Sequence, residues 1–231
     1  MCSIILRRDE TGLCIAANRD EMASRPWDPP ADYWPGICGG RDLLAGGTWA
    51  AVNRHGVVAA LLNRQGTLGP ATGKESRGML PLLALTQPSA RAAMAHLRDL
   101  DCGRYRSFNL VLADALGAIL LRGLEAGRPD VEILPSGTTM ITSGEPNDTA
   151  CPRIARHLPR FTASPFAQWG ALLADSFGPR AAQINIPSSE NNGFGTVCAM
   201  LIRLPRQGAP AHCFAAGPPD KAPFQPIPWP A

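Results

Sequence analysis

Residues 1–21 have the sequence MCSIILRRDETGLCIAANRDE, and this stretch decides the fold prediction. Two short apolar runs, 2–7 and 13–18, are separated by a polar segment, 9–12, that is short enough for a hairpin turn. The sequence therefore predicts an N-terminal β-hairpin whose first strand starts at Cys2.

Outward from this hairpin, strands and helices alternate in blocks. Strands are expected at 50–53, 57–63, 108–113, 119–123, 131–134, 138–142, 194–204 and 212–216, and helices at 77–85, 89–100, 152–158 and 166–177. The proline- and tryptophan-rich segment 24–38 is expected to be an extended surface loop. This order predicts an α+β fold, a four-layer αββα sandwich of two antiparallel sheets. We expect one domain over 1–231, with an irregular proline-rich tail from about 218.

Composition narrows the class of protein. Hydrophobic residues make up 45% and charged residues 18% of the 231 residues, with a net charge of +3, which is typical of an ordinary globular protein and not of a nucleic-acid-coating one. The apolar start, Ile4–Leu6, is closed at once by arginines and lacks the order of a secretory signal. The most apolar later stretch, 108–121, contains Asp114 and Gly117, so stable membrane insertion is not expected. No nucleic-acid partner is predicted.

The seven cysteines indicate a reducing compartment. Their number is odd, their spacing is irregular and none forms a CxxC pair, so we expect reduced thiols, a cytoplasmic location and no structural metal site.

Cys2 is the residue around which chemistry is expected. Methionine aminopeptidases remove Met1 when the second residue is small, and the new terminus then carries a thiol and an α-amine on one residue. An unperturbed α-amine has a pKa of about 7.7 to 8.0, so it can accept the proton of the thiol. Such a nucleophile carries its own base and needs only an orienting acceptor and oxyanion donors. Alternatively, Cys2 is a small apolar residue at the start of a strand.

Several motifs occur together with Cys2. They include Met1–Ile4, Ala17–Glu21, Gly46–Trp49, Ser76–Gly78 and Phe108–Leu110. In order and spacing they resemble the NRDE protein family, also called the Transport and Golgi Organisation protein two family, densely up to about Asp114 and thinly beyond. This resemblance implies a cysteine-type N-terminal-nucleophile hydrolase fold.

The resemblance also assigns roles to residues. In the bile-salt and penicillin-V amidase relatives, an asparagine-x-aspartate pattern ends the second strand, and its carboxylate orients the amine of the cysteine. That role falls on Asp20, and the same motif adds Asn18 and Arg19 to the site. A buried Asp20 would need a cationic or donor partner, which a protonated Cys2 amine would supply. Asn53 matches a segment whose backbone contributes to the oxyanion hole. Structural ion pairs and a simple turn asparagine explain Asp20 and Asn53 nearly as well.

Two positions depart from the family pattern. Where the relatives place an oxyanion asparagine this chain has Ile141–Gly144, so the shorter hydroxyl of Ser143 would have to serve. The usual glycine-threonine-arginine becomes Gly195, Thr196 and Val197, so a positive charge is missing from that strand. Losing one oxyanion donor typically costs about 100- to 1000-fold in turnover, so a slow or retired hydrolase stays open.

The sequence thus favours hydrolysis of a small, non-peptide amide by Cys2, with no cofactor required. The alternative is a haem-binding or haem-trafficking chaperone, since family members are implicated in haem movement. Thiolates and imidazoles available as haem ligands are Cys2, Cys151, His157, His212 and Cys213. A third option is a pocket for a lipophilic ligand lined by Trp27, Tyr33 and Trp34, although these aromatic residues also suit ordinary packing. The oligomeric state is not predicted.

Overall fold

The computed structural model describes residues 2–190 and 192–231, and the chain separates into two compact units. The first unit consists of the residues up to Arg25 together with Ser136–Pro228, and the second of Pro26–Pro135 with Trp229–Ala231. Each unit contains one antiparallel sheet, which confirms the predicted α+β class with two antiparallel sheets. The single domain expected over 1–231 stays a prediction.

The first unit is built on the predicted N-terminal hairpin. Its sheet has the order β10-β1-β2-β11-β12-β13. The strands are β1 (Ser3–Asp9), β2 (Gly12–Met22), β10 (Gly137–Ile141), β11 (Phe194–Pro205), β12 (Ala211–Ala215) and β13 (Gln225–Ile227). In the central pairings Ser3 lies opposite Asn18, and Asp20 lies opposite Thr196. The start of β1, the end of β2 and the start of β11 therefore meet at one place.

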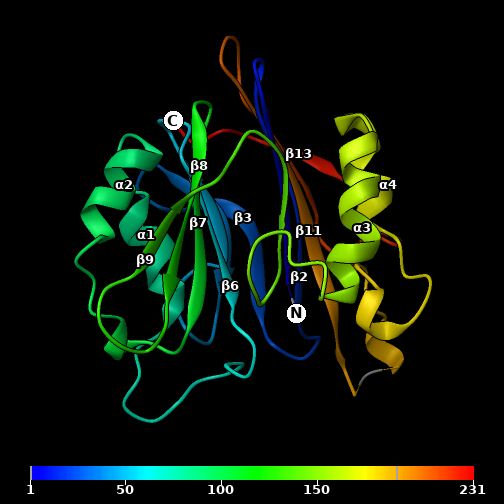
Figure 1. Ribbon diagram of the computed structural model, residues 1–231, viewed down its shortest axis with the longest axis horizontal. Coiled ribbons are helices and arrows are strands. Elements are labelled where there is room, and N and C mark those ends of the chain that lie inside the picture. Colours follow the sequence, from blue (N-terminus) through cyan, green and yellow to red (C-terminus); the bar gives the residue numbers. More distant parts are fainter. Residues whose placement is uncertain (1, 191) are drawn as a thin grey trace. The chain divides into compact units, whose positions relative to one another are not determined.

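Helices cover one face of this sheet. They are α3 (Pro152–Ala163) and α4 (Trp169–Leu173), which Figure 1 shows at the right of the view, with short 3-10 turns at Phe166–Gln168, Arg180–Ala182 and Ser188–Glu190. Ile154, Phe161 and Trp169 pack with Ile5 and Ala16 of the sheet, and all five side chains are fully buried.

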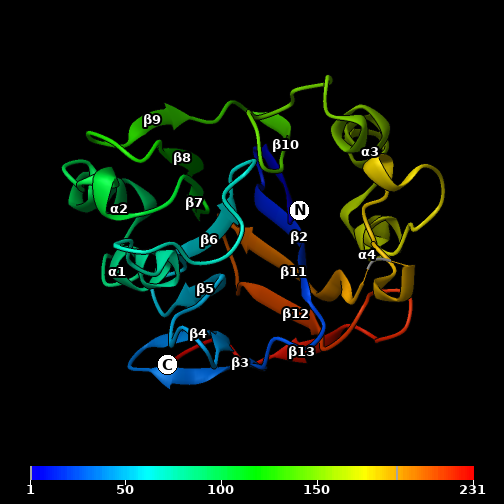
Figure 2. The same ribbon diagram turned by 90° about the horizontal axis from the view of Figure 1, so that it is seen from below.

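The second unit is a meander of strands interrupted by a helical insertion. Its sheet runs in sequence order from β3 to β9. The strands are β3 (Trp27–Trp34), β4 (Ile37–Asp42), β5 (Ala50–Asn53), β6 (Val58–Asn63), β7 (Phe108–Asp114), β8 (Gly117–Gly123) and β9 (Asp130–Ile133). Between β6 and β7 lie α1 (Leu80–Ala84) and α2 (Ala90–Leu97), with 3-10 turns at Arg77–Met79 and Cys102–Arg104. Figure 2 shows both helices lying together on one side of this sheet. Ser89 caps α2 by accepting a hydrogen bond from the Ala92 amide at 3.1 Å.

One local prediction is wrong, and a second one is incomplete. Most of segment 24–38 is not a loop, because β3 and the start of β4 occupy it, with breaks in register between Asp28 and Ala31 and between Ala31 and Trp34. Pro29 and Pro30 stand in an edge strand, which is where a sheet tolerates residues that lack an amide donor. The tail after 218 is not wholly irregular either, because β13 pairs with β12.

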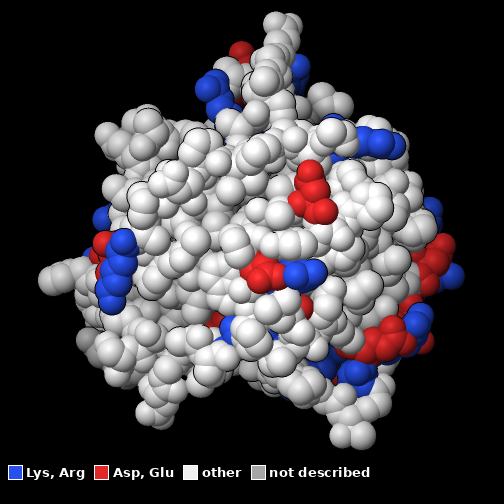
Figure 3. Space-filling view, turned by 180° about the vertical axis from the view of Figure 1, so that it is seen from behind, with Lys and Arg blue, Asp and Glu red and all other residues white. Residues whose placement is uncertain are grey.

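Charges are interspersed on the surface. On the face in Figure 3, basic and acidic side chains lie next to each other in small groups, and most of the surface between them is uncharged. Within the described residues, no helix is long and apolar enough to cross a membrane.

Candidate active site

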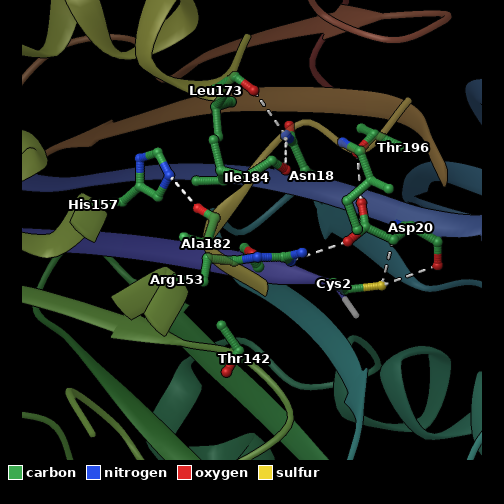
Figure 4. A network of polar contacts seen from close by, with 12 residues as sticks. Cys2, Asn18, Asp20, Thr142, Arg153, His157, Leu173, Ala182, Ile184 and Thr196 are labelled. Carbon is green, nitrogen blue, oxygen red and sulfur yellow. Dashed lines mark hydrogen bonds and ion pairs between the residues drawn. The ribbon is translucent and has the colours of Figure 1, made fainter. Parts of the chain in front are cut away.

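Cys2 lies just before β1, and its sulfur rests against the backbone of β2. The amide of Asp20 donates a hydrogen bond to Sγ at 3.4 Å, and the thiol donates to the Asp20 carbonyl at 3.6 Å (Figure 4). The hairpin register brings these atoms together, because Ser3 pairs with Asn18 and Cys2 continues the strand by one residue. Cys2 is half-buried.

The carboxylate of Asp20 points to side chains of α3 and β11. Its Oδ2 atom lies 3.0 Å from Nη1 of Arg153, and its Oδ1 accepts a hydrogen bond from the Thr196 hydroxyl at 2.7 Å. The Asp20 side chain is 0% and the Arg153 side chain 3% exposed, so water does not screen this ion pair. Arg153 is therefore a cationic partner for Asp20. From the sequence, a protonated Cys2 amine was expected to be this partner.

Arg153 also contacts the residue next to the nucleophile. The same Nη1 atom donates a hydrogen bond to the Ser3 hydroxyl at 3.0 Å. One guanidinium group thus touches the start of β1 and the end of β2, the two segments that place the Cys2 sulfur. Figure 4 shows its contact with Asp20.

Thr196 is held in a fixed orientation by the segment before β11. Its hydroxyl accepts a hydrogen bond from the Ile186 amide at 2.8 Å, and its amide donates to the Ile186 carbonyl at 2.9 Å. The hydroxyl proton is then directed to Asp20. This close approach requires Gly195, because a Cβ atom there would lie 2.5 Å from the Ile186 carbonyl oxygen. The register of β11 against β2 shifts between Thr196 and Cys198, which is a β-bulge beside Asp20.

The thiol of Cys2 is protonated at neutral pH in this environment. Burial raises the pKa of Cys2, and the negative charge of Asp20 raises it further. Attack by the sulfur therefore requires a base that takes the proton during the reaction.

The other predicted residues on β2 have separate partners. The Asn18 amide donates to the carbonyls of Leu173 and Ile184, both at 2.9 Å, which ties β2 to the segments around α4 (Figure 4). Arg19 is buried and lies 3.8 Å from the Glu21 carboxylate. Its side chain leaves the strand on the face opposite to that of Asp20.

Ser143 and Asn53 lie in different units. Ser143 is buried two residues beyond the end of β10, and since Ile141 pairs with Ile4, the same register continued would place it opposite Cys2. Asn53 belongs to the second unit, and its carboxamide is fully used by backbone groups. It donates to the carbonyls of Leu85 at 2.9 Å and Gln87 at 2.8 Å, and accepts from the amides of His55 and Val57, both at 3.0 Å. The oxyanion roles of Ser143 and Asn53 stay predictions.

The histidines named as haem ligands differ in their surroundings. His157 is fully buried in α3, its Nε2 lies 2.8 Å from the Ala182 carbonyl and its Nδ1 lies 3.3 Å from Nη1 of Arg160. His212 is 5% exposed, and among the described residues neither ring nitrogen has a hydrogen-bond partner. Within residues 2–190 and 192–231, no group of three or more His, Cys, Asp or Glu side chains is arranged to hold a metal ion.

Comparison with known families agrees with these motifs. The family model described as Transport and Golgi organisation 2 matches residues 1–164. The chain belongs to the Transport and Golgi organisation 2 family. The human Transport and Golgi organization protein 2 homolog is 30% identical over 208 residues, covering 83% of this chain and 74% of the human protein. A mouse homolog is 31% identical over 137 residues, covering 54% of this chain and 48% of the mouse protein.

Solved structures share the fold of this family member at low sequence identity. An N-acylethanolamine-hydrolyzing acid amidase ortholog from Caenorhabditis elegans has a TM-score of 0.60 and 12% identity, covering 87% of this chain and 92% of its own. Penicillin V acylase from Agrobacterium tumefaciens has a TM-score of 0.58 and 12% identity, covering 94% and 83%. A variant of conjugated bile acid hydrolase from Clostridium perfringens has a TM-score of 0.56 and 10% identity, covering 98% and 96%. These are proteins with the N-terminal-nucleophile hydrolase fold, which confirms the fold prediction.

Sequence reasoning missed Ser3, Thr196 and Arg153 as site residues. A signal for Arg153 was present, because Arg153, His157 and Phe161 follow each other at helical spacing, and all three are buried. A charged residue in the apolar stripe of a helix indicates a buried partner. Position 197, where the resemblance implied a positive charge, is valine, and in the structure Arg153 of α3 is a cation beside Asp20.

Proposed function

We propose that this chain is a cysteine-dependent amidohydrolase that cleaves the C–N bond of a small, non-peptide amide. The observation that supports it is the position of the Cys2 sulfur, which contacts the backbone of Asp20. The carboxylate of the same residue belongs to a buried network with Arg153 and Thr196. The names of the structural neighbours, an amidase, an acylase and a hydrolase, point to the same reaction class.

The mechanism requires removal of Met1, which lies outside the described residues. The Cys2 sulfur attacks the carbonyl carbon, a C–S bond forms, the carbonyl π electrons move to oxygen, and the thiol proton moves to the α-amine. The Asp20 carboxylate stabilises the resulting ammonium group. Collapse of the tetrahedral intermediate breaks the C–N bond, and the ammonium proton passes to the leaving amine. Water, deprotonated by the amine, then hydrolyses the thioester and regenerates the thiol.

The proposed reaction also implies a cofactor requirement, a partner and a cellular location. No cofactor takes part in these steps, and the partner is a small-molecule substrate. All seven cysteines are free thiols in the structure, which supports a reducing, cytoplasmic location. Haem binding remains the alternative, but the polar contacts of both His157 ring nitrogens inside the fold leave that residue little capacity for a metal.

Mass spectrometry and an activated ester test the function. The intact mass is expected to show loss of Met1, and p-nitrophenyl hexanoate is expected to give a burst of nitrophenolate with one acyl group on Cys2. Cys2→Ala should abolish the burst. Cys14→Ala, which removes another half-buried thiol of the same hairpin, should leave it intact. Retained Met1, or acylation that survives Cys2→Ala, would contradict the mechanism, and a stoichiometric Soret shift with haemin would favour the alternative.

A further inference from the structure

The ion pair between Arg153 and Asp20 is costly for a fold to keep. Both side chains are almost completely buried, and taking a charge out of water has a large free-energy cost for each ion. A well-packed apolar pair in such a place is often as stable or more stable. Stability alone therefore does not explain why the fold keeps a buried ion pair at this place.

Arg153 is also placed against the dipole of its own helix. It follows Pro152 in the first turn of α3, a turn that contains no acidic residue. The N-terminus of a helix carries partial positive charge, so a cation there is electrostatically unfavourable. The helix end adds to the cost of burying this residue.

The Arg153 Nη1 atom donates hydrogen bonds to the two residues that adjoin Cys2 in the chain and in the sheet. This atom donates to Oδ2 of Asp20 and to the Ser3 hydroxyl, both at 3.0 Å. Ser3 is bonded to Cys2, and the backbone of Asp20 contacts the Cys2 sulfur. Thr196 holds the second carboxylate oxygen of Asp20 from β11. The carboxylate is thus fixed by a helix on one side and a strand on the other.

We propose that Arg153 is the positioning residue of the Cys2 site: it holds the Asp20 carboxylate in one orientation, so that this carboxylate can stabilise the α-ammonium group formed when the thiol gives up its proton. This inference rests on the proposed function. Arg153 contacts Asp20 and Ser3, and its proposed role is exerted through Asp20. The buried charge is then explained by the reaction step that needs an anion beside a new cation.

Burst kinetics with p-nitrophenyl hexanoate test this role, with rates expressed per thiol of Cys2 titrated by alkylation. Arg153→Met is expected to slow acylation about 100-fold, as a misplaced catalytic group does. The ester concentration for half-maximal rate should change little, because the proposed role of Arg153 is exerted through Asp20 and not through contact with the ester. Arg153→Lys keeps a cation but has one nitrogen in place of the fork, so it should recover about tenfold of that loss. Arg156→Met is the matched control, one turn along α3 and paired with Asp175.

A double-mutant cycle distinguishes positioning from general damage. If Arg153 acts through Asp20, adding Arg153→Met to Asp20→Asn should change the acylation rate less than about threefold. This double variant carries no buried charge at the pair, so it keeps the experiment informative if Arg153→Met alone does not fold. An Arg153→Met rate within about threefold of wild type, or a double variant about 30-fold slower than Asp20→Asn, would overturn the inference. A wild-type chain with no burst at all would overturn the proposed function, and this inference with it.

Discussion

At the scale of single residues, Asn53 of the second unit has a structural role that its hydrogen bonds define. The Asn53 carboxamide makes two donated and two accepted hydrogen bonds with backbone groups of its own turn and of the segment after α1. An asparagine with all four positions used has no free donor for an oxyanion. Its side chain fixes the β5–β6 turn to the helical layer of the second sheet.

Asn53→Ala is therefore expected to lower stability. Four backbone groups lose their partner at a buried position, and we expect the free energy of unfolding to fall by about 3 kcal/mol. Urea denaturation measures this loss, and the ester burst measures the effect on chemistry. A stability within about 1 kcal/mol of wild type together with a 100-fold slower burst would instead assign the side chain to the oxyanion site.

Sequence reasoning at this scale found the residues that a short motif carries and missed those that come from elsewhere in the chain. The contact between Cys2 and Asp20 follows from the hairpin register, since strands joined by a two-residue turn have a fixed pairing. Arg153 reaches the same place through tertiary packing of α3, which no local spacing encodes. Thr196 was noted as part of a family motif, but its hydroxyl bond to Asp20 depends on the long-range pairing of β11 with β2.

At the scale of elements, the predictions were best where hydrophobic periodicity was strong. The hairpin of β5 and β6 and the capped helix α2 were predicted within a few residues. The strand β3 was missed because Pro29 and Pro30 interrupt any strand pattern, and only the neighbouring β4 supplies the pairing. The motif Gly46–Trp49 lies in the connection between β4 and β5. The surroundings of its two glycines explain why this connection contains residues without a side chain.

Gly47→Ala is expected to destabilise the second unit more than Gly46→Ala. A Cβ atom on Gly47 would lie 2.4 Å from the carbonyl carbon and oxygen of Gly78, and backbone atoms cannot move aside cheaply. Overpacking of this kind costs about 3 kcal/mol or more. Gly46 has open space around it and a φ of +71°, so alanine there costs only about 1 kcal/mol of backbone strain. Thermal denaturation of both variants measures the difference, and equal losses would contradict this explanation.

At the scale of the whole molecule, the sequence predicted the class of fold but not which strands join which sheet. The strand β10 follows β9 along the chain, yet it pairs with β1 in the other sheet, and the paired residues lie 129 to 137 positions apart in the sequence. Pairings of such separation depend on the folded chain as a whole and leave no periodic signal. The two sheets were expected from the order of elements, and the partner of each distant strand came only from the structure.

Two buried histidines are expected to make the stability of the molecule depend on pH. Burial lowers the pKa of His157 and of His212 to about 4, below the ordinary value near 6.5. The unfolded chain binds protons at these sites between pH 6.5 and 4 while the folded chain does not. Stability is therefore fully present above pH 6.5 and is lost as the pH falls through that value, by about 3 kcal/mol per histidine once the pH reaches 4.

Urea denaturation between pH 5 and 7.5, above the range where most carboxylates titrate, measures this dependence. His157→Gln/His212→Gln should flatten the slope of unfolding free energy against pH, even though each substitution lowers stability at neutral pH. His55→Gln/His96→Gln, which replaces the two exposed histidines, is the matched control and should keep the wild-type slope. A wild-type chain whose stability rises on acidification over this range, or a buried-site variant with an unchanged slope, would show that the two imidazoles are not the groups that bind protons on unfolding.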